Sequence, residues 1–285
     1  MTQDMNASTL TIPGFVIAYK TWGEPYLPPL IAIHGWLDNA NSFELLAPYL
    51  SKQFHVIAID LPGHGHSSHL PEGCYYHFVD GIFYVLQIAK ALGFDQYHLL
   101  GHSMGACLGS LVAGVVPDQI LSLVLIEGLG PFSDLEEHCC AQLAKYAKLA
   151  CEDAAHEVKA YPSLELAVHA RAKHGFLAPK YIKIISQRGL QRRKETFYWR
   201  HDRRLLLATP LRLTENQILS CLNNIQAKSC LIWASHGFEF DKGQRRTREE
   251  AIKNLQIHYL EGGHHVHMEH PDTVAECLGQ FYKTL

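Results

Sequence analysis

"LLGHSMGA", residues 99–106, places one serine between two glycines, each of them two positions away. The stretch ends one apolar run and opens a second apolar segment, 105–116, which predicts a strand, a sharp turn and a helix in that order. In such a turn the serine backbone is strained, and a side chain two positions away would collide with the neighbouring strand or helix. The pattern therefore predicts that Ser103 presents its hydroxyl above the sheet edge, at the positive end of a helix that stabilises a developing oxyanion.

Six short apolar runs are predicted to be strands of one sheet. Each is too short for a helix, and most are continuous rather than alternating, which is typical of strands buried on both faces of a parallel sheet. Residues 80–93 begin with an acidic residue, keep an apolar spacing of about 3.6 residues and end in glycine, which predicts a crossover helix. This alternation indicates a doubly wound α/β sheet. The six runs are 30–34, 55–60, 97–101, 121–127, 230–234 and 255–260.

The alternation stops between Glu127 and Cys230, where two alanine-rich segments carry helical periodicity. Residues 131–216 are therefore predicted to be a helical insertion, which divides the sheet-forming chain into 1–130 and 217–285. Ligands of such sheets bind beyond the carboxyl ends of the strands. An insertion that leaves from the carboxyl end of a strand is expected to form a lid over that crevice.

A serine hydroxyl is a weak nucleophile near neutral pH, so Ser103 requires a base within hydrogen-bond reach and a carboxylate that orients this base. The stretch "EGGHHVHMEHP", residues 261–271, follows the last predicted strand. This is where the histidine belongs when the chain order is serine, acid, histidine. No acidic or cysteine ligand set accompanies the histidines of this stretch, so no metal site is predicted there. These histidines are His264, His265, His267 and His270.

Together these motifs resemble the α/β-hydrolase superfamily, and the resemblance covers the whole predicted sheet. In this superfamily the last histidine commonly occurs in the pattern G-H-x-x-x-x-E-x-P. The resemblance implies that His264, rather than His265 or His267, is the base. The residues that match the pattern are Gly263, His264, Glu269 and Pro271.

"HGW", residues 34–36, follows the run 30–34 and looks like the superfamily's oxyanion turn. The resemblance implies that the backbone amides of Trp36 and Met104 donate to the developing negative charge. Trp36 and His102 are also expected to contact the substrate.

The carboxylate that completes a triad has two alternative positions in this superfamily. The first is the end of the strand after the elbow helix, where Glu127 directly follows an apolar run. The second follows the next strand, where Glu239 and Asp241 lie in "WASHGFEFDKGQ" and the usual G-x-x-D pattern is disturbed. We favour Glu127, although an acid at a strand end can also cap the following turn.

The segment 189–217, "GLQRRKETFYWRHDRRLLLATPLRLTENQ", adds a more specific likeness. Together with the stretches around the turn 34–36, Glu127 and His264, it looks like the serine hydrolase-like subfamily. The resemblance implies an enzyme of the carboxylic-ester hydrolase type that has a helical lid and forms an acyl-serine intermediate, with no metal or organic cofactor. A serine at position 103 argues against reactions that proceed through an aspartyl ester.

Two alternatives on the same fold stay open: a ligand receptor that retains the triad, and a cofactor-free lyase or oxygenase. The formal net charge of −3 without a long block of one sign argues against nucleic-acid partners. The chain has no apolar run of the roughly 20 residues that span a bilayer, no signal-peptide pattern at its start and no CxxC pair among its eight cysteines. We therefore expect a cytoplasmic protein with reduced thiols and a small-molecule acyl substrate.

Overall fold

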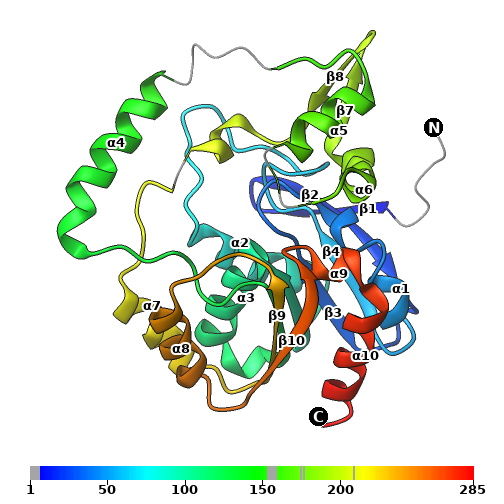
Figure 1. The fold of residues 1–285 in the computed structure, drawn as a ribbon, viewed down its shortest axis with the longest axis vertical. Coiled ribbons are helices and arrows are strands. Elements are labelled where there is room, and N and C mark those ends of the chain that lie inside the picture. The colour runs from blue at the N-terminus through cyan, green and yellow to red at the C-terminus, as the bar shows by residue number, and fades with distance from the viewer. Residues whose placement is uncertain (1–6, 153–158, 174, 176, 208) are drawn as a thin grey trace.

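The computed structural model describes residues 7–152, 159–173, 175, 177–207 and 209–285 (Figure 1). An eight-stranded sheet with the order β1-β2-β4-β3-β5-β6-β9-β10 forms its centre. The strands are β1 (Ala7–Ile12), β2 (Phe15–Trp22), β3 (Pro29–Ile33), β4 (His55–Ile59), β5 (Tyr97–His102), β6 (Ile120–Ile126), β7 (Leu190–Arg193), β8 (Thr196–Trp199), β9 (Lys228–His236) and β10 (Leu255–Gly263).

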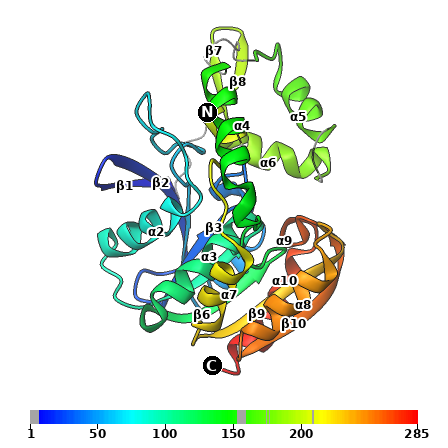
Figure 2. The same ribbon diagram turned by 90° about the vertical axis from the view of Figure 1, so that its left-hand side faces the viewer.

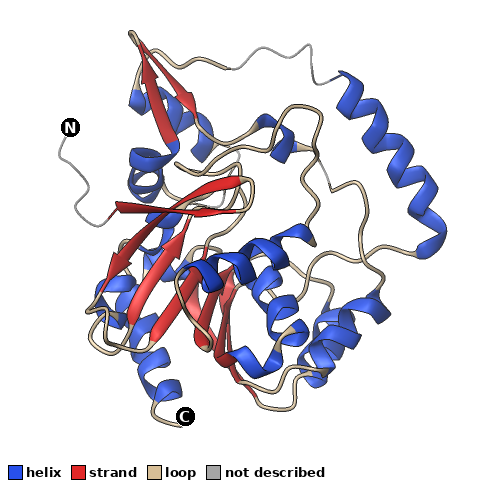
Figure 3. Cartoon of the chain, turned by 180° about the vertical axis from the view of Figure 1, so that it is seen from behind, coloured by secondary structure: helices blue, strands red, loops and turns tan. Residues whose placement is uncertain are grey.

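Helices connect most of these strands and flank the sheet (Figure 3). In the described part of the chain, no helix has both the length and the apolar character needed to cross a bilayer. The α-helices are α1 (Ala47–Leu50), α2 (Asp80–Ala91), α3 (Met104–Val115), α4 (Cys139–Glu152), α5 (Leu164–Ala172), α6 (Pro179–Gly189), α7 (Glu215–Asn223), α8 (Lys242–Ala251), α9 (Val266–Glu269) and α10 (Pro271–Tyr282). The short 3-10 helices are η1 (Ala40–Phe43), η2 (Pro117–Gln119), η3 (Glu136–His138) and η5 (Arg203–Leu206).

The predicted doubly wound, mostly parallel sheet is confirmed. Strands β3, β4, β5, β6, β9 and β10 pair in parallel, and these are the six apolar runs of the sequence. Strands β1 and β2 were not predicted; they form an antiparallel hairpin that pairs with β4 at one edge. Their residues are more exposed than those of the central strands, so they lack the continuous apolar run that a doubly covered strand requires.

Two hydrophobic cores lie on opposite faces of the sheet, which explains the continuous apolar runs. Along β3, Ile31 and Ile33 belong to the core formed with α2, α3 and α7, whereas Leu30 and Ala32 belong to the core formed with α1 and α10. Successive side chains of a strand point to opposite faces. In a strand that is covered on both sides, every side chain therefore faces a hydrophobic core, and the apolar run is continuous. Strand β10 lies at the other edge, and its residues are half-buried or exposed.

The segment between β6 and α7 contains α4, α5 and α6 and lies beyond the carboxyl ends of the strands, at the top of Figure 2. It also contains β7 and β8, an antiparallel pair in which Leu190 lies opposite Trp199. The sequence predicts a helical insertion, and this hairpin corrects that prediction, because part of the insertion is β-structure. Its strands are short and partly exposed and carry no run of the kind that identified the central strands. Five parts of the chain, including 153–158, 174, 176 and 208 of the predicted insertion, lie outside the described residues.

The turn between β5 and α3 sets the spacing of the central strands and the helix. Ser103 has φ of 51° and ψ of −118°, a conformation that L-residues rarely adopt. A Cβ atom on Gly101 would lie 2.3 Å from the carbonyl oxygen of Gly105, and a Cβ on Gly105 would lie 2.1 Å from the carbonyl oxygen of Ile33. Both obstacles are backbone atoms, so the close approach of β3, β5 and α3 requires glycine at both positions.

We expect Gly105→Ala to lower the free energy of unfolding by about 3 kcal/mol, because the added methyl group meets backbone that cannot rotate away. Gly279 in α10 is the matched control, since a Cβ there has nothing within 4 Å. Alanine at position 279 is expected to raise the free energy of unfolding by up to about 1 kcal/mol, as a better helix former. Urea unfolding followed by circular dichroism measures both changes. Equal unfolding midpoints for the two variants would contradict the close-packed turn.

Candidate active site

Three residues from three separate strand ends meet beyond the carboxyl edge of the sheet. Ser103 follows β5, Glu127 follows β6 and His264 follows β10. Nε2 of His264 lies 2.8 Å from Oγ of Ser103, and Nδ1 lies 2.9 Å from Oε2 of Glu127. Because the carboxylate accepts the proton on Nδ1, the lone pair of Nε2 faces the serine hydroxyl. This geometry allows the imidazole to take a proton from the serine.

The carboxylate of Glu127 is held by hydrogen bonds from the end of β9 and from the loop that follows it. Oε1 accepts from the amide of Ala234 at 2.6 Å, and Oε2 accepts from the amide of Phe238 at 2.9 Å. A Cβ on Gly237 would lie 2.1 Å from Oε2, so glycine lets this loop wrap around the carboxylate. With 1% of its surface exposed, Glu127 is fixed in position by these donors and by His264.

The two alternative acids lie elsewhere on the same loop. Asp241 is exposed and caps the start of α8, where Oδ1 accepts from the amide of Gln244 at 2.8 Å. Glu239 is also exposed. The structure therefore brings Glu127, and neither Glu239 nor Asp241, to His264. The loop that carries the disturbed G-x-x-D pattern contributes backbone donors instead of an acid.

The turn 34–36 runs directly against the elbow. A Cβ on Gly35 would lie 3.3 Å from Cβ of Ser103, so a side chain there would crowd the nucleophile. Within the described residues, the amides of Trp36 and Met104 have no hydrogen-bond acceptor. Two unpaired amides beside a serine hydroxyl are the donor set that an oxyanion requires.

A cavity of about 1250 Å³ opens above Ser103 and His264. Its lining includes the turn at Trp36, residues of α2 and the segment around η5 of the insertion. The indole Nε1 of Trp36 donates to the carbonyl oxygen of Leu205 at 2.9 Å. Trp36 thereby connects the turn beside Ser103 to the insertion, which forms part of the cavity wall.

Comparison with known proteins agrees with this geometry. The model of the family described as "alpha/beta hydrolase fold" matches residues 28–271. The chain belongs to the alpha/beta hydrolase fold family. Among curated members, a serine hydrolase-like protein of Dictyostelium discoideum is 30% identical over 94% of this chain and 79% of its own length.

Two solved structures of alpha/beta hydrolase fold proteins cover almost the whole chain. A hypothetical protein from Pseudomonas aeruginosa PAO1 is 34% identical with a TM-score of 0.91, and the match covers 98% of each chain. The thioesterase domain from the curacin biosynthetic pathway is 25% identical with a TM-score of 0.82, over 97% of this chain and 99% of the domain. The likeness to the Dictyostelium discoideum protein places this chain among serine hydrolase-like members of the family.

A buried ion pair links the insertion to the residue beside His264. Nε2 of His265 lies 3.0 Å from Oδ2 of Asp38, and the guanidinium of Arg171 in α5 donates to Oδ1 of the same carboxylate. Burial acts to raise the pKa of Asp38, but His265 and Arg171 outweigh it and hold this pKa well below its usual range. Asp38 and Arg171 are not among the predicted site residues, because they are 133 residues apart and no local pattern pairs them.

His102 holds the backbone of His264 in place. Its Nε2 donates to the carbonyl oxygen of His264 at 2.8 Å, and 1% of its surface is exposed. Burial, together with the neighbouring His267 and His265, lowers the pKa of His102 well below its usual value. The ring also borders the cavity. Its contact with a substrate stays a prediction.

The four histidines of the stretch 261–271 do not form one ligand set. His264 contacts Ser103 and Glu127, His265 contacts Asp38, and Nε2 of His267 lies 2.9 Å from Oγ of Ser42. Asp38, His102 and His265 do place ligand atoms within 4.8 Å of one another. However, the positive charge of Arg171 already balances the carboxylate there and opposes a cation.

Buried neutral imidazoles make the stability of the fold sensitive to acid. Burial, followed by the neighbouring His265, lowers the pKa of His267 from 6.5 to about 3. Between these values the unfolded chain binds a proton that the folded chain does not, so stability falls as the pH decreases below about 6.5. The largest slope from one such histidine is about 1.4 kcal/mol per pH unit.

We therefore expect His267→Gln, which keeps a partner for Ser42, to lose less stability between pH 6.5 and pH 4 than the unaltered protein. His236, which is exposed on β9, provides the control His236→Gln. Urea unfolding at a series of pH values gives the free energy of unfolding for each protein. Parallel pH dependence for all three proteins would show that His267 is not the titrating group.

Proposed function

We propose that this alpha/beta hydrolase fold protein cleaves a carboxylic ester through an acyl-serine intermediate. The observation that carries the proposal is the continuous contact from Ser103 Oγ to His264 Nε2, and from His264 Nδ1 to Glu127. The strained backbone of Ser103 at the start of α3 and the likeness of 94% of this chain to a serine hydrolase-like protein also support it.

In the first half of the reaction, Oγ of Ser103 attacks the carbonyl carbon of the ester while Nε2 of His264 accepts the hydroxyl proton. The amides of Trp36 and Met104 donate to the oxyanion of the tetrahedral intermediate. His264 then gives the proton to the leaving alcohol, and the acyl group stays on the serine. Glu127 holds the Nδ1–H tautomer and stabilises the imidazolium as it forms.

In the second half, water replaces the alcohol. His264 takes a proton from the water as the hydroxide attacks the acyl carbon, and the same two amides stabilise the second tetrahedral intermediate. Collapse of this intermediate returns the proton to Ser103 and releases the carboxylic acid. His264 and the two amides act in both halves of the reaction, which requires no metal ion or organic cofactor.

The cavity supports an apolar acyl chain as the substrate's larger part. Its volume of about 1250 Å³ exceeds the size of a site for a short acyl group. Leucines of the insertion and aromatic residues just before α2 contribute to its wall, and the cationic side chains of Lys159, Arg171, Arg203 and Arg212 also border it. The apolar lining residues include Phe78, Val79, Leu205, Leu206, Leu207 and Leu211.

Hydrolysis of p-nitrophenyl esters with short and medium acyl chains tests the proposed function. We expect turnover by the unaltered protein, with a preference for the medium chain, and a loss on the order of 10⁴-fold or more in Ser103→Ala. A fluorophosphonate should add one equivalent to the unaltered protein and none to the variant, which mass spectrometry measures. A thioester of the preferred acyl group, assayed in parallel, distinguishes ester from thioester specificity.

Two outcomes would contradict this function. Turnover that survives in Ser103→Ala would exclude the serine as the nucleophile. Folded protein that binds an ester without turning it over would instead favour a triad-bearing receptor or a lyase on the same fold. Circular dichroism of both proteins shows that the comparison is made on folded material.

The acid is tested by Glu127→Gln beside Asp241→Asn. Glutamine at 127 keeps the shape of the side chain but favours the wrong imidazole tautomer, so kcat is expected to fall on the order of 10⁴-fold. Asparagine at 241 retains the cap of α8, so kcat should stay close to that of the unaltered protein. The ester assay measures both variants, and the opposite ranking would transfer the role to Asp241.

A further inference from the structure

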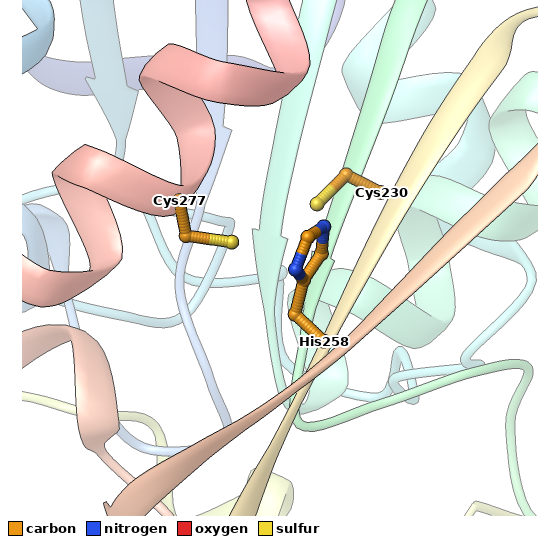
Figure 4. Close-up of side chains that lie close together, drawn as sticks. All are labelled: Cys230, His258 and Cys277. Carbon is orange, nitrogen blue, oxygen red and sulfur yellow. The ribbon is translucent and has the colours of Figure 1, made fainter.

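Two cysteines and one histidine converge at a second place, between one face of the sheet and α10. Cys230 in β9, His258 in β10 and Cys277 in α10 each offer one ligand atom, and these atoms lie within 4.8 Å of one another. Figure 4 shows the two sulfur atoms directed toward the imidazole ring from the strand and from the helix. The three residues share no sequence motif, because each comes from a different element.

The register of the sheet produces this convergence. In the parallel pair of β9 and β10, Cys230 lies opposite Gln256, so His258, two residues further, points to the same face as Cys230. Cys277 belongs to the core that α10 forms on this face. Cys230 lies near the start of β9, whereas Ala234, which contacts Glu127, lies near its end. The cluster is therefore separate from the candidate active site.

The donors are buried, and the imidazole is without a partner. Cys230 has none of its surface exposed and Cys277 has 7%. Nε2 of His258 is buried and has no hydrogen-bond partner among the described residues, and neither does the hydroxyl of Tyr282 beside the cluster. A buried polar atom of this kind carries a desolvation cost that a bound cation would remove.

The two thiols approach the imidazole from the strand and from the helix (Figure 4). A thiolate is the form of cysteine that binds a metal, so ligation requires both thiols to lose their protons.

We propose that Cys230, His258 and Cys277 bind one zinc ion. Two sulfur donors and one imidazole are a ligand set that favours Zn²⁺ over Mg²⁺ or Ca²⁺. Binding breaks two S–H bonds, releases both protons to solvent and forms two Zn–S bonds and one Zn–N bond, with no change of oxidation state. The ion and two thiolates together are neutral, which suits a buried position. Water completes the tetrahedron.

The required movement is small. Ligand atoms of a tetrahedral zinc site lie about 3.7 Å apart, so donors within 4.8 Å approach one another by about 1 Å. Strand β10 is the edge of the sheet and His258 is half-buried, so an ion can enter from this edge. Once bound, it fastens the C-terminal helix α10 to the last two strands. Its role is structural, and it is independent of the proposed ester hydrolysis.

Cobalt titration of the full chain tests the site directly. The protein is freed of metal with a chelator, kept reduced, and titrated with Co²⁺, whose thiolate complexes absorb in the near ultraviolet. We expect this absorption to saturate at one Co²⁺ per chain and to disappear when Zn²⁺ displaces it. Zn²⁺ should also raise the Tm, because it binds the folded chain.

Variants separate this site from other thiols and histidines. Cys277→Ala should abolish the cobalt–thiolate absorption, and His258→Gln should weaken Zn²⁺ binding at least tenfold. The matched controls Cys140→Ala and His236→Gln replace exposed residues and should bind as the unaltered protein does. Circular dichroism checks that each variant is folded. Absence of stoichiometric binding, or absorption that persists in Cys277→Ala, overturns the proposal.

Discussion

Ser103 occupies a backbone conformation with φ of 51°, and the packing around it leaves no alternative. Gly101 and Gly105 allow β5 and α3 to approach within the space that a Cβ would fill. The same approach brings the turn 34–36 to the serine and points the first amide of α3 at it. The packing of the central sheet therefore holds Ser103 in this strained conformation. The position of the serine relative to His264 and the turn 34–36 depends on that packing.

Around the serine, the carboxylates and the histidines are held by partners from distant parts of the chain. The carboxylate of Glu127 accepts hydrogen bonds from one amide at the end of β9 and one in the loop after it, and the backbone of His264 is held by His102. Asp38 joins His265 to Arg171 of the insertion. Because the ring orientations are set before substrate binds, little reorganisation is needed when charge develops. The ion pair also couples the insertion to the site that it covers.

Histidine serves different purposes in this fold according to its surroundings. His264 lies between a hydroxyl and a carboxylate, which suits proton transfer. His102 and His267 are buried among other imidazoles and stay neutral, so they act as fixed hydrogen-bonding groups. His258 faces two thiols at the far end of the sheet, which suits ligation. One residue type supplies three kinds of chemistry because burial and neighbours decide its charge.

The sequence by itself determined the central sheet and the elbow turn at Ser103, and it singled out His264, which contacts this serine. Each of these is encoded locally, by apolar runs, by glycines two positions from a serine, and by a spaced motif. It missed the edge hairpin of β1 and β2, whose strands are too exposed to leave an apolar run. Only the tertiary structure brought Glu127 rather than Asp241 to the base, paired Asp38 with Arg171, and gathered Cys230, His258 and Cys277. These contacts depend on strand register and on how elements pack across the sheet, and no local pattern of residues records either.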